Sequence, residues 1–183
     1  MKILTALLLL LASANTSAAM ITLDISGADD ALTTPLTLSA ILDVDEGSGE
    51  MVAFSSFNLN VLFDNTLFDY VTDSASSSLP MGVIAAQNPA GVGVTYFNLG
   101  DVMVSADTTL FSLQLQALSA GTTSLSLMLS ELYSGGFMTP AMPVVLAQNT
   151  ASQQVTVAQS VPVPHTLGLF VLALGLMLRR FRR

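Results

Sequence analysis

Apolar and polar residues alternate with a period of two along most of this chain, and no other feature of the sequence constrains its fold as strongly. The clearest alternating runs lie at 21–26, 36–42, 56–63, 111–117, 124–130 and 155–157. Successive side chains of a strand point to opposite faces of a sheet, so these runs predict strands with one face on a core and the other in water. Segments rich in Gly, Pro, Asn, Asp and Ser separate them. We therefore expect an all-β, antiparallel β-sandwich of about eight or nine short strands.

The charged residues are unevenly distributed. The 13 acidic residues all lie between Asp24 and Glu131. The five basic residues lie at the two ends of the chain: Lys2, Arg179, Arg180, Arg182 and Arg183. Nucleic acid is excluded as a partner of the middle segment because neutralising phosphates requires Lys or Arg. The self-repulsion of an acidic surface instead favours a soluble domain in an extracellular setting.

The middle segment lacks the residues that the common catalytic sites use. The chain has no cysteine, and its single histidine, His165, lies near the C-terminus. A Ser-His-Asp triad or a histidine-based zinc site inside the domain is thereby excluded. Asp64 and Asp69 could form an acid/base pair, but a strand-ending turn and a solvent-facing strand position explain them better. We expect no enzymatic activity.

One acidic loop is a candidate metal site. Residues 43–50 contain four carboxylates and two glycines, and Ca²⁺ binds oxygen ligands of this kind. The candidate ligands are Asp43, Asp45, Glu46 and Glu50. Their spacing does not match an EF-hand, and a solvated turn is the alternative interpretation. No other cofactor is expected.

The first 19 residues have the three parts of an export signal. Lys2 supplies a positive start, residues 3–12 form a short apolar core, and Ser17, Ala18 and Ala19 supply the small residues at which a signal peptidase cuts. We expect a signal peptide over 1–19, with cleavage after Ala19. The apolar core is too short for a membrane-spanning helix.

The last 23 residues combine a proline-rich hinge, an apolar run and an arginine cluster. The run from Thr166 to Leu178 would span about 20 Å as a helix, less than the roughly 30 Å of a bilayer core. Including the hinge brings it closer to spanning, and the arginines would stay on the cytoplasmic side. A plain single-span anchor is one interpretation of this segment.

The order of these parts resembles the PEP-CTERM sorting signal of Gram-negative bacteria. The resemblance rests on Val161, Pro162, Val163 and Pro164, the Leu/Gly-rich run, and Arg179, Arg180, Arg182 and Arg183. It departs from the family pattern at Val163, where that pattern usually has Glu. The resemblance implies that an exosortase cuts near the prolines and sends the protein to the cell surface or the extracellular matrix.

The middle of the chain resembles cohesin modules. Residues 52–68 read as an alternating strand, an aromatic–Asp pair, a turn and a second strand, and residues 110–130 are similar to the second half of such modules. The resemblance implies a jelly-roll β-sandwich, in a superfamily shared with some bacterial carbohydrate-binding modules. Cohesins bind dockerins, so it also implies a module that acts by binding.

These features predict three segments: a signal peptide at 1–19, a cohesin-like domain at 20–160, and a sorting or transmembrane segment at 161–183. We expect a non-catalytic interaction module exported from a Gram-negative bacterium, held transiently at the inner membrane and then placed at the cell surface or outside the cell. Its expected partners are signal peptidase and exosortase during export, and afterwards a surface protein or a polysaccharide. A self-associating matrix or adhesin subunit is a further alternative. Tyr70, Tyr96 and Tyr133 are expected to pack in the core or at its edge.

Overall fold

The structure, a computed structural model, describes residues 19–28, 31–44, 51–137 and 139–158. The predicted C-terminal segment and all of the predicted signal peptide except Ala19 lie outside the described residues. Among the described residues, no helix has the length and apolar character that crossing a membrane requires.

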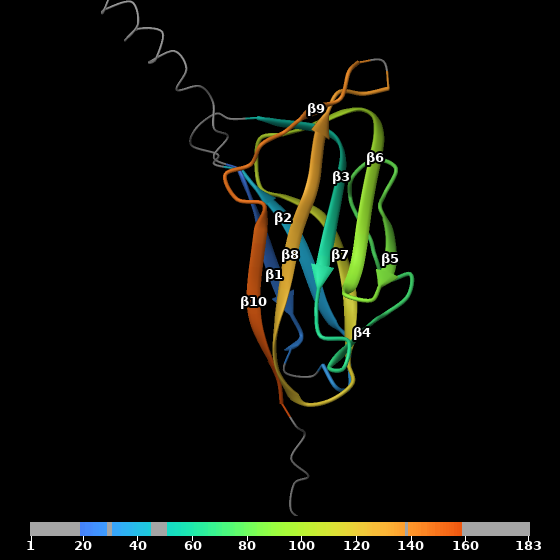
Figure 1. The fold of residues 1–183 in the computed structure, drawn as a ribbon, viewed down its shortest axis with the longest axis vertical. Coiled ribbons are helices and arrows are strands. Elements are labelled where there is room, and N and C mark those ends of the chain that lie inside the picture. The colour runs from blue at the N-terminus through green and yellow to red at the C-terminus, as the bar shows by residue number, and fades with distance from the viewer. Residues whose placement is uncertain (1–18, 29–30, 45–50, 138, 159–183) are drawn as a thin grey trace, which may run out of the picture.

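The described residues form ten strands in two antiparallel sheets, which confirms the expected all-β sandwich (Figure 1). One sheet has four strands in the order β1-β2-β7-β4, and the other has six, in the order β10-β8-β3-β6-β5 with β9 beside β8. The strands are β1 (Met20–Ser26), β2 (Leu36–Asp43), β3 (Val52–Leu62), β4 (Phe68–Tyr70), β5 (Ile84–Asn88), β6 (Gly91–Val104), β7 (Thr108–Ala117), β8 (Gly121–Ser134), β9 (Met142–Pro143) and β10 (Thr150–Val157). The number slightly exceeds the expectation because β4 and β9 are too short to show an alternating pattern.

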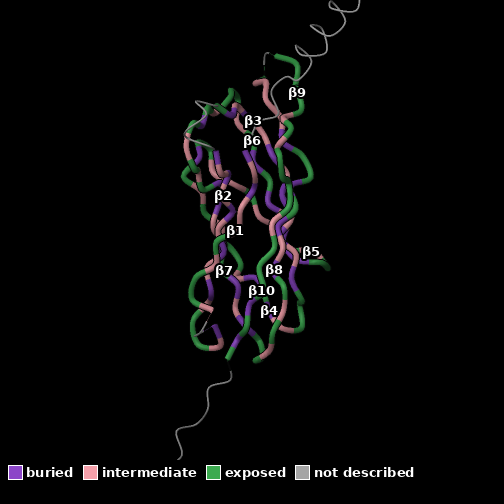
Figure 2. The backbone as a smooth tube through the Cα atoms, turned by 90° about the vertical axis from the view of Figure 1, so that its left-hand side faces the viewer, coloured by how far each residue is buried: buried purple, intermediate pink, exposed green. Residues whose placement is uncertain are grey.

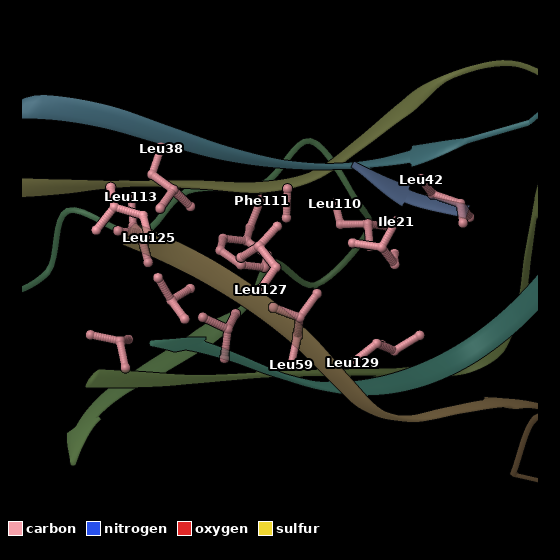
Figure 3. Packing of buried hydrophobic residues seen from close by; sticks show 14 of the residues in the cluster. Ile21, Leu38, Leu42, Leu59, Leu110, Phe111, Leu113, Leu125, Leu127 and Leu129 are labelled. Atoms are coloured by element: carbon pink, nitrogen blue, oxygen red, sulfur yellow. The ribbon is translucent and has the colours of Figure 1, made fainter. Parts of the chain in front are cut away.

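The inward-facing residues of both sheets make one hydrophobic core. Figure 2 shows buried and exposed residues alternating along the strands, as the period of two predicts. Leu38 and Leu113 from the four-stranded sheet face Leu125 and Leu127 from the six-stranded sheet (Figure 3). Burial of these side chains supplies the main stabilising free energy of a sandwich of this kind.

An aromatic cluster fills the centre of this core. The ring of Phe57 stacks on that of Tyr96, with 5.2 Å between centroids, and lies 6.5 Å from that of Phe111 in the other sheet. Phe54 packs against both Phe57 and Tyr96. The cluster joins three strands and both sheets, so it fixes their separation.

An irregularity in the pairing of β3 with β6 explains why the alternation in the sequence begins only near residue 56. The pairing of β3 with β6 shifts register between Phe54 and Ser56. The inward residues therefore change phase, and Ser55 is buried although it is polar. Its hydroxyl donates a hydrogen bond to the carbonyl oxygen of Gly135, 2.8 Å away. Across this shift one residue of β3, Ser55, lies opposite residues 98–101 of β6, so the extra residues belong to β6 while the period of two in β3 is interrupted.

The hairpin that joins β5 to β6 depends on a glycine. Gly91 has a φ of 149°, and a Cβ placed there would lie 1.9 Å from the carbonyl oxygen of Val61. Only glycine permits this approach between two backbones. The hairpin follows Asn88 and Pro89, at one of the turns that the sequence predicted.

Candidate functional site

The exposed apolar side chains are concentrated on one of the two sheets. Of the described residues, six large hydrophobic side chains that are exposed lie in strands, and all six belong to the six-stranded sheet: Ile84, Phe97, Leu99, Met103, Met128 and Met142. None lies in a strand of the four-stranded sheet. Because clustered exposed apolar side chains mark interaction surfaces, the outer face of the six-stranded sheet is the candidate site.

An aromatic row crosses this face. Ser56 on the central strand β3 pairs with Phe97 on one side and with Tyr133 on the other. The next pairs along the strands, Phe57 with Tyr96 and with Leu132, are buried, so the alternation directs Phe97 and Tyr133 outward. Strands lie about 4.8 Å apart, which places the two aromatic residues roughly 10 Å from each other across the serine. Phe97 is 55% exposed.

A hydrogen-bonded polar row lies beside the aromatic row. The hydroxyl of Thr95 donates to Asn58 Oδ1 at 2.9 Å, and Asn58 Nδ2 donates to Glu131 Oε2 at 2.8 Å. Three strands, β6, β3 and β8, each supply one member. The chain of bonds holds each side chain in one orientation, so that the remaining donors and acceptors have fixed positions for a ligand.

A third row continues the face, with Asn60 on β3 between Gly93 on β6 and the exposed Met128 on β8. Asn60 donates from its side-chain amide to the hydroxyl of Ser130 at 2.9 Å. On its other side Asn60 pairs with Gly93, whose missing side chain leaves the surface flat. The face, which we call the binding face, therefore consists of an aromatic row and two polar rows: Ser56, Phe97 and Tyr133; Thr95, Asn58 and Glu131; Asn60, Ser130 and Gly93.

A hollow lies at the β8 end of the polar rows. Beyond β9 the chain leaves β8 over residues 144–149 and returns to it as β10. The space between this segment and residues 129–132 of β8 has a volume of about 330 Å³. Ser130, Glu131, Val144 and Ala147 are among its lining residues. Glu131 therefore belongs both to the polar row and to the lining of this hollow.

The outer face of the four-stranded sheet differs in its contacts. Ser39 and Ser112 hydrogen-bond to each other at 2.8 Å, and the amide of Gln116 donates to the backbone oxygen of Ala31 at 2.8 Å. The free edge of β7 beyond β4 is covered because Ser76 exchanges two backbone hydrogen bonds with Ser112. The side chains of Ser39, Ser112 and Gln116 thus serve the fold itself.

The structure gives Asp64 and Asp69 separate structural roles. Asp64 Oδ1 accepts hydrogen bonds from the hydroxyl and the backbone N–H of Thr66, and these bonds lower the pKa of Asp64 below its ordinary value. Asp69 is exposed on β4 and accepts a hydrogen bond from the side chain of Gln87 at 3.0 Å. Asp64 stabilises a turn, as the turn pattern indicated, and Asp69, on a solvent-facing strand position, adds a contact between the two sheets.

The predicted calcium loop falls largely outside the described residues. Asp43 is described and ends β2, whereas Asp45, Glu46 and Glu50 are not. Within the described ranges, no group of three or more His, Asp or Glu side chains could hold a metal ion. The sorting residues at 161–183 also lie outside the described part, so these two assignments remain predictions.

The three tyrosines differ from one another in position. Tyr70 and Tyr96 are buried, as expected, and burial raises the pKa of the Tyr96 hydroxyl. Tyr133 instead belongs to the aromatic row on the outer face.

The sequence pattern identified the solvent-facing residues of β3, including Asn58 and Asn60. It did not identify Phe97, Tyr133, Thr95 and Glu131 as members of one group. The missing information was strand pairing, which brings together residues more than 30 positions apart.

Among the comparisons with known proteins, only the one with solved structures found similar proteins. No protein-family model matches the chain, and no curated protein matches its sequence. Among solved structures, a cohesin module from a Clostridium perfringens family 33 glycoside hydrolase is similar with a TM-score of 0.55 at 13% identity, over 78% of this chain and 98% of that one.

Two further solved structures show the same likeness. A non-cellulosomal cohesin from the archaeon Archaeoglobus fulgidus has a TM-score of 0.51 at 16% identity, over 79% of this chain and 94% of that one. A type II cohesin–X-dockerin complex from Acetivibrio cellulolyticus has a TM-score of 0.54 at 12% identity, over 76% of this chain and 99% of the matched one. The described part of this chain is therefore a cohesin-like β-sandwich.

Proposed function

We propose that this protein is an exported, non-catalytic module that binds another protein through the binding face. The observation that carries the proposal is the uncovered aromatic row beside a hydrogen-bonded polar row. Aromatic side chains at the centre of a surface supply most of the binding energy in many interfaces, and polar groups around them supply specificity. The pre-ordered Thr95–Asn58–Glu131 chain lowers the entropy that binding would otherwise cost.

The fold supports this proposal without identifying the partner. One of the similar structures is a cohesin in complex with an X-dockerin, so this type of sandwich serves as a binding module elsewhere. The sequence identity of 12% carries the fold and not the partner. We infer the partner's chemistry instead from this chain.

The charge of the domain favours a partner with a neutral or basic surface. Residues 20–160 hold all 13 acidic residues and no Lys or Arg. An acidic partner would be repelled over the whole approach, whereas a basic one would be attracted. Glu131 is the carboxylate that such a partner would meet on the binding face, because it lies in the polar row and lines the adjoining hollow.

The test is affinity capture with two matched variants. The domain is used to capture proteins from the secreted and surface fractions of the bacterium that makes it. Thr95→Arg places a long charged side chain on the binding face, and Gln114→Arg places the same group on the exposed outer side of the four-stranded sheet. We expect Thr95→Arg to abolish capture of a partner that the wild type and Gln114→Arg both retain. Equal capture by both variants would show that the partner binds elsewhere.

We further propose that the protein reaches this setting by a two-step route. Signal peptidase would remove the N-terminal segment, and an exosortase would cut near Pro162 and Pro164 after the C-terminal segment has held the protein at the inner membrane. The support is the order of hinge, apolar run and arginine cluster in the sequence. The intact mass of the protein from the cell surface tests this route. A mass without the C-terminal segment is expected, and a mass that includes Arg183 would indicate a plain anchor.

A polysaccharide is the second candidate ligand, and the aromatic row favours it specifically. Exposed rings can stack on sugar rings while Asn, Thr and Glu side chains bond to hydroxyl groups. Retention on a polysaccharide column that is lost in Phe97→Ala would support this candidate. If no polysaccharide retains the wild type, protein binding is left as the function of the face.

A further inference from the structure

We propose that two copies of this chain pair through β5, so that their six-stranded sheets join into one continuous antiparallel sheet. This inference goes beyond the proposed function, because it concerns the edge of the sheet and not its outer face. Three features of β5 carry it: its open edge, the absence of charge along it, and the direction of its backbone groups.

The first feature is that β5 ends the six-stranded sheet (Figure 1). All five of its residues, Ile84–Asn88, pair with residues 91–95 of β6. Among the described residues, no strand or isolated bridge pairs with the other side of β5. The strand at the opposite edge of this sheet, β10, instead packs against β1. β5 therefore offers a row of backbone donors and acceptors to another strand.

The second feature is the lack of charge on this strand and around it in the chain. Residues 20–160 hold 13 acidic residues and no basic ones, yet no charged residue lies between Asp73 and Asp101. Natural proteins commonly protect an edge strand with charged residues or proline, but β5 has neither, and its Ile84 is 75% exposed. Asp69, whose carboxylate accepts a bond from Gln87, belongs to the other sheet. Two copies of an acidic domain repel each other, and this edge is where they can approach at the lowest electrostatic cost.

The third feature is the direction in which the backbone groups of β5 point. The N–H of Phe63 donates to the oxygen of Ala90, and this bond continues the register of β3 with β6. Hydrogen-bonded and non-hydrogen-bonded residue pairs alternate along antiparallel strands. Val92 and Val94, two and four residues after Ala90, therefore direct their backbone groups toward β3, whereas residues 91, 93 and 95 direct theirs toward β5.

The same alternation leaves two residues of β5 with backbone groups at the open edge. The residues of β6 that point toward β5 pair with Asn88, Ala86 and Ile84, so the N–H and C=O groups of Ala85 and Gln87 point outward. In an antiparallel pair of copies with Ala86 opposite its own counterpart, Ala85 of each copy lies opposite Gln87 of the other. Both of these pairs can exchange hydrogen bonds, and two-fold symmetry makes them equivalent. This register therefore uses all the outward backbone groups of the strand.

Such a dimer would double the binding face without covering it. Ile84 and Ala86 pair with Thr95 and Gly93, which belong to the polar rows. Residues opposite each other on adjacent strands lie on the same face of a sheet, so the two binding faces would lie on one side of the joined sheet. Two faces side by side raise the apparent affinity for a partner with repeated sites.

The mass of the protein in solution gives the first test. The protein produced from the full chain is purified in a mild detergent, which keeps any apolar terminal segment in solution, and its mass is measured by sedimentation equilibrium. The joined strands are short, so we expect a weak dimer that forms as the concentration approaches about 1 mM. Added salt should raise the dimer fraction, because salt screens the repulsion between acidic domains. A monomer throughout, or a dimer that salt dissociates, overturns the inference.

Charged substitutions at Ala86 test the register. Ala86 is exposed, and like charges directly opposite each other on adjacent strands are destabilising. Ala86→Glu and Ala86→Lys should therefore each be monomeric, whereas an equal mixture of the two should regain the dimer. Ala158→Glu changes an exposed residue just after β10, at the opposite edge of the sheet, and should dimerise as the wild type does. A dimer that persists in Ala86→Glu would be formed by other surfaces, the terminal segments included, and would contradict the inference.

Disulfide trapping detects the pairing of a short-lived dimer. The chain has no cysteine, so Ala86→Cys introduces a single thiol, opposite its counterpart in the proposed register. The Cβ atoms of directly opposite residues lie about 5 Å apart, close to the separation that a disulfide requires. Mild oxidation should link Ala86→Cys into a dimer much faster than Ala158→Cys. Equal rates would overturn the inference, and the capture experiment with Thr95→Arg would still decide the proposed function separately.

Discussion

The outer face of the four-stranded sheet carries Thr37, Ser39 and Gln114, whereas the outer face of the six-stranded sheet carries Phe97, Asn58 and Glu131. Both faces are formed by the solvent-facing residues of the same alternating pattern, and both sheets pack on the same hydrophobic core. In the first, the hydroxyls of Ser39 and Ser112 bond to each other across neighbouring strands, and the amide of Gln116 bonds to the backbone of Ala31. In the second, aromatic and apolar side chains stay exposed beside a polar row that is already ordered.

This difference shows that the two sides of a strand serve separate purposes. The inward residues of both sheets are restricted by packing, because a close-packed core tolerates little change in volume. The outward residues are free of that restriction. An exposed phenylalanine such as Phe97 is expected to contribute little to folding, and its position fits the proposed binding role. The following predictions test the comparison between inner and outer positions, and between the two outer faces.

The largest loss of free energy of unfolding is expected for a substitution in the core beneath the binding face. Phe57→Ala removes the ring that contacts Phe54, Tyr96 and Phe111, and we expect the free energy of unfolding to fall by about 3–5 kcal/mol. Phe97→Ala, which changes the same residue type on the other side of the sheet, should lower it by no more than about 0.5 kcal/mol. Urea unfolding of the two variants measures both values. Similar losses would show that the exposed ring is part of the core.

The second effect separates the binding face from other exposed apolar sites. Phe97→Ala should weaken binding of the captured partner by about 2 kcal/mol, roughly 30-fold, if this ring is a central anchor. Leu118 is also 55% exposed but lies in the turn after β7, so Leu118→Ala is the matched control and should bind normally. Titration calorimetry with the captured partner gives both affinities. Equal weakening by the two substitutions would argue against a localised site.

The third effect concerns the buried hydroxyl of Tyr96. Among the described residues, this oxygen has no hydrogen-bond partner, so Tyr96→Phe removes an unsatisfied polar group and should raise the free energy of unfolding by about 1 kcal/mol. Burial raises the pKa of this hydroxyl. Below the pKa of an unfolded tyrosine, ionisation of Tyr96 therefore does not reduce the free energy of unfolding of the wild type. That free energy falls as the pH rises above about 10.

Alkaline unfolding curves of Tyr96→Phe and Tyr133→Phe check this assignment. The Tyr96→Phe variant should keep its stability to higher pH than the wild type. Tyr133→Phe, on the outer face, should leave the free energy of unfolding within about 0.5 kcal/mol of the wild type at neutral pH. A loss of stability in Tyr96→Phe would mean that the hydroxyl has a partner, such as an internal water.

The smallest effect is expected at the turn after β3, where Asp64 changes how the free energy of unfolding depends on pH in acid. Hydrogen bonds from the hydroxyl and the N–H of Thr66 lower the pKa of Asp64 below 3.8, so the unfolded state takes up a proton first as the pH falls. The stabilisation is present above the unfolded pKa and is lost as the pH falls through the folded one. Asp64→Asn keeps a side-chain oxygen for the turn without titrating there. The difference in stability between pH 6 and pH 2 should therefore be smaller in Asp64→Asn, and an unchanged difference would rule out this contribution.

Much of the fold could be predicted from the sequence, and the binding face could be predicted only in part. The runs around Leu38, Leu113 and Leu127 gave correct strands with correct inward residues, because period-two patterning is a local property. The start of β3 was harder to recognise because the register shift at Ser55 interrupts the period of two. On the binding face the sequence placed Asn58 and Asn60 on the wet side. It did not place Phe97 or Tyr133 beside Ser56.

The sequence by itself determined the class of fold, the acidic character of the domain and the absence of the residues needed for common catalytic sites. The tertiary structure decided which outward residues lie next to each other, which of two similar outer faces keeps its apolar side chains exposed, and which strand forms the edge of the six-stranded sheet. The physical reason is the range of the interactions. Alternation is set by the pleat of a single strand, whereas a row across a sheet depends on the pairing of strands that are far apart in the chain.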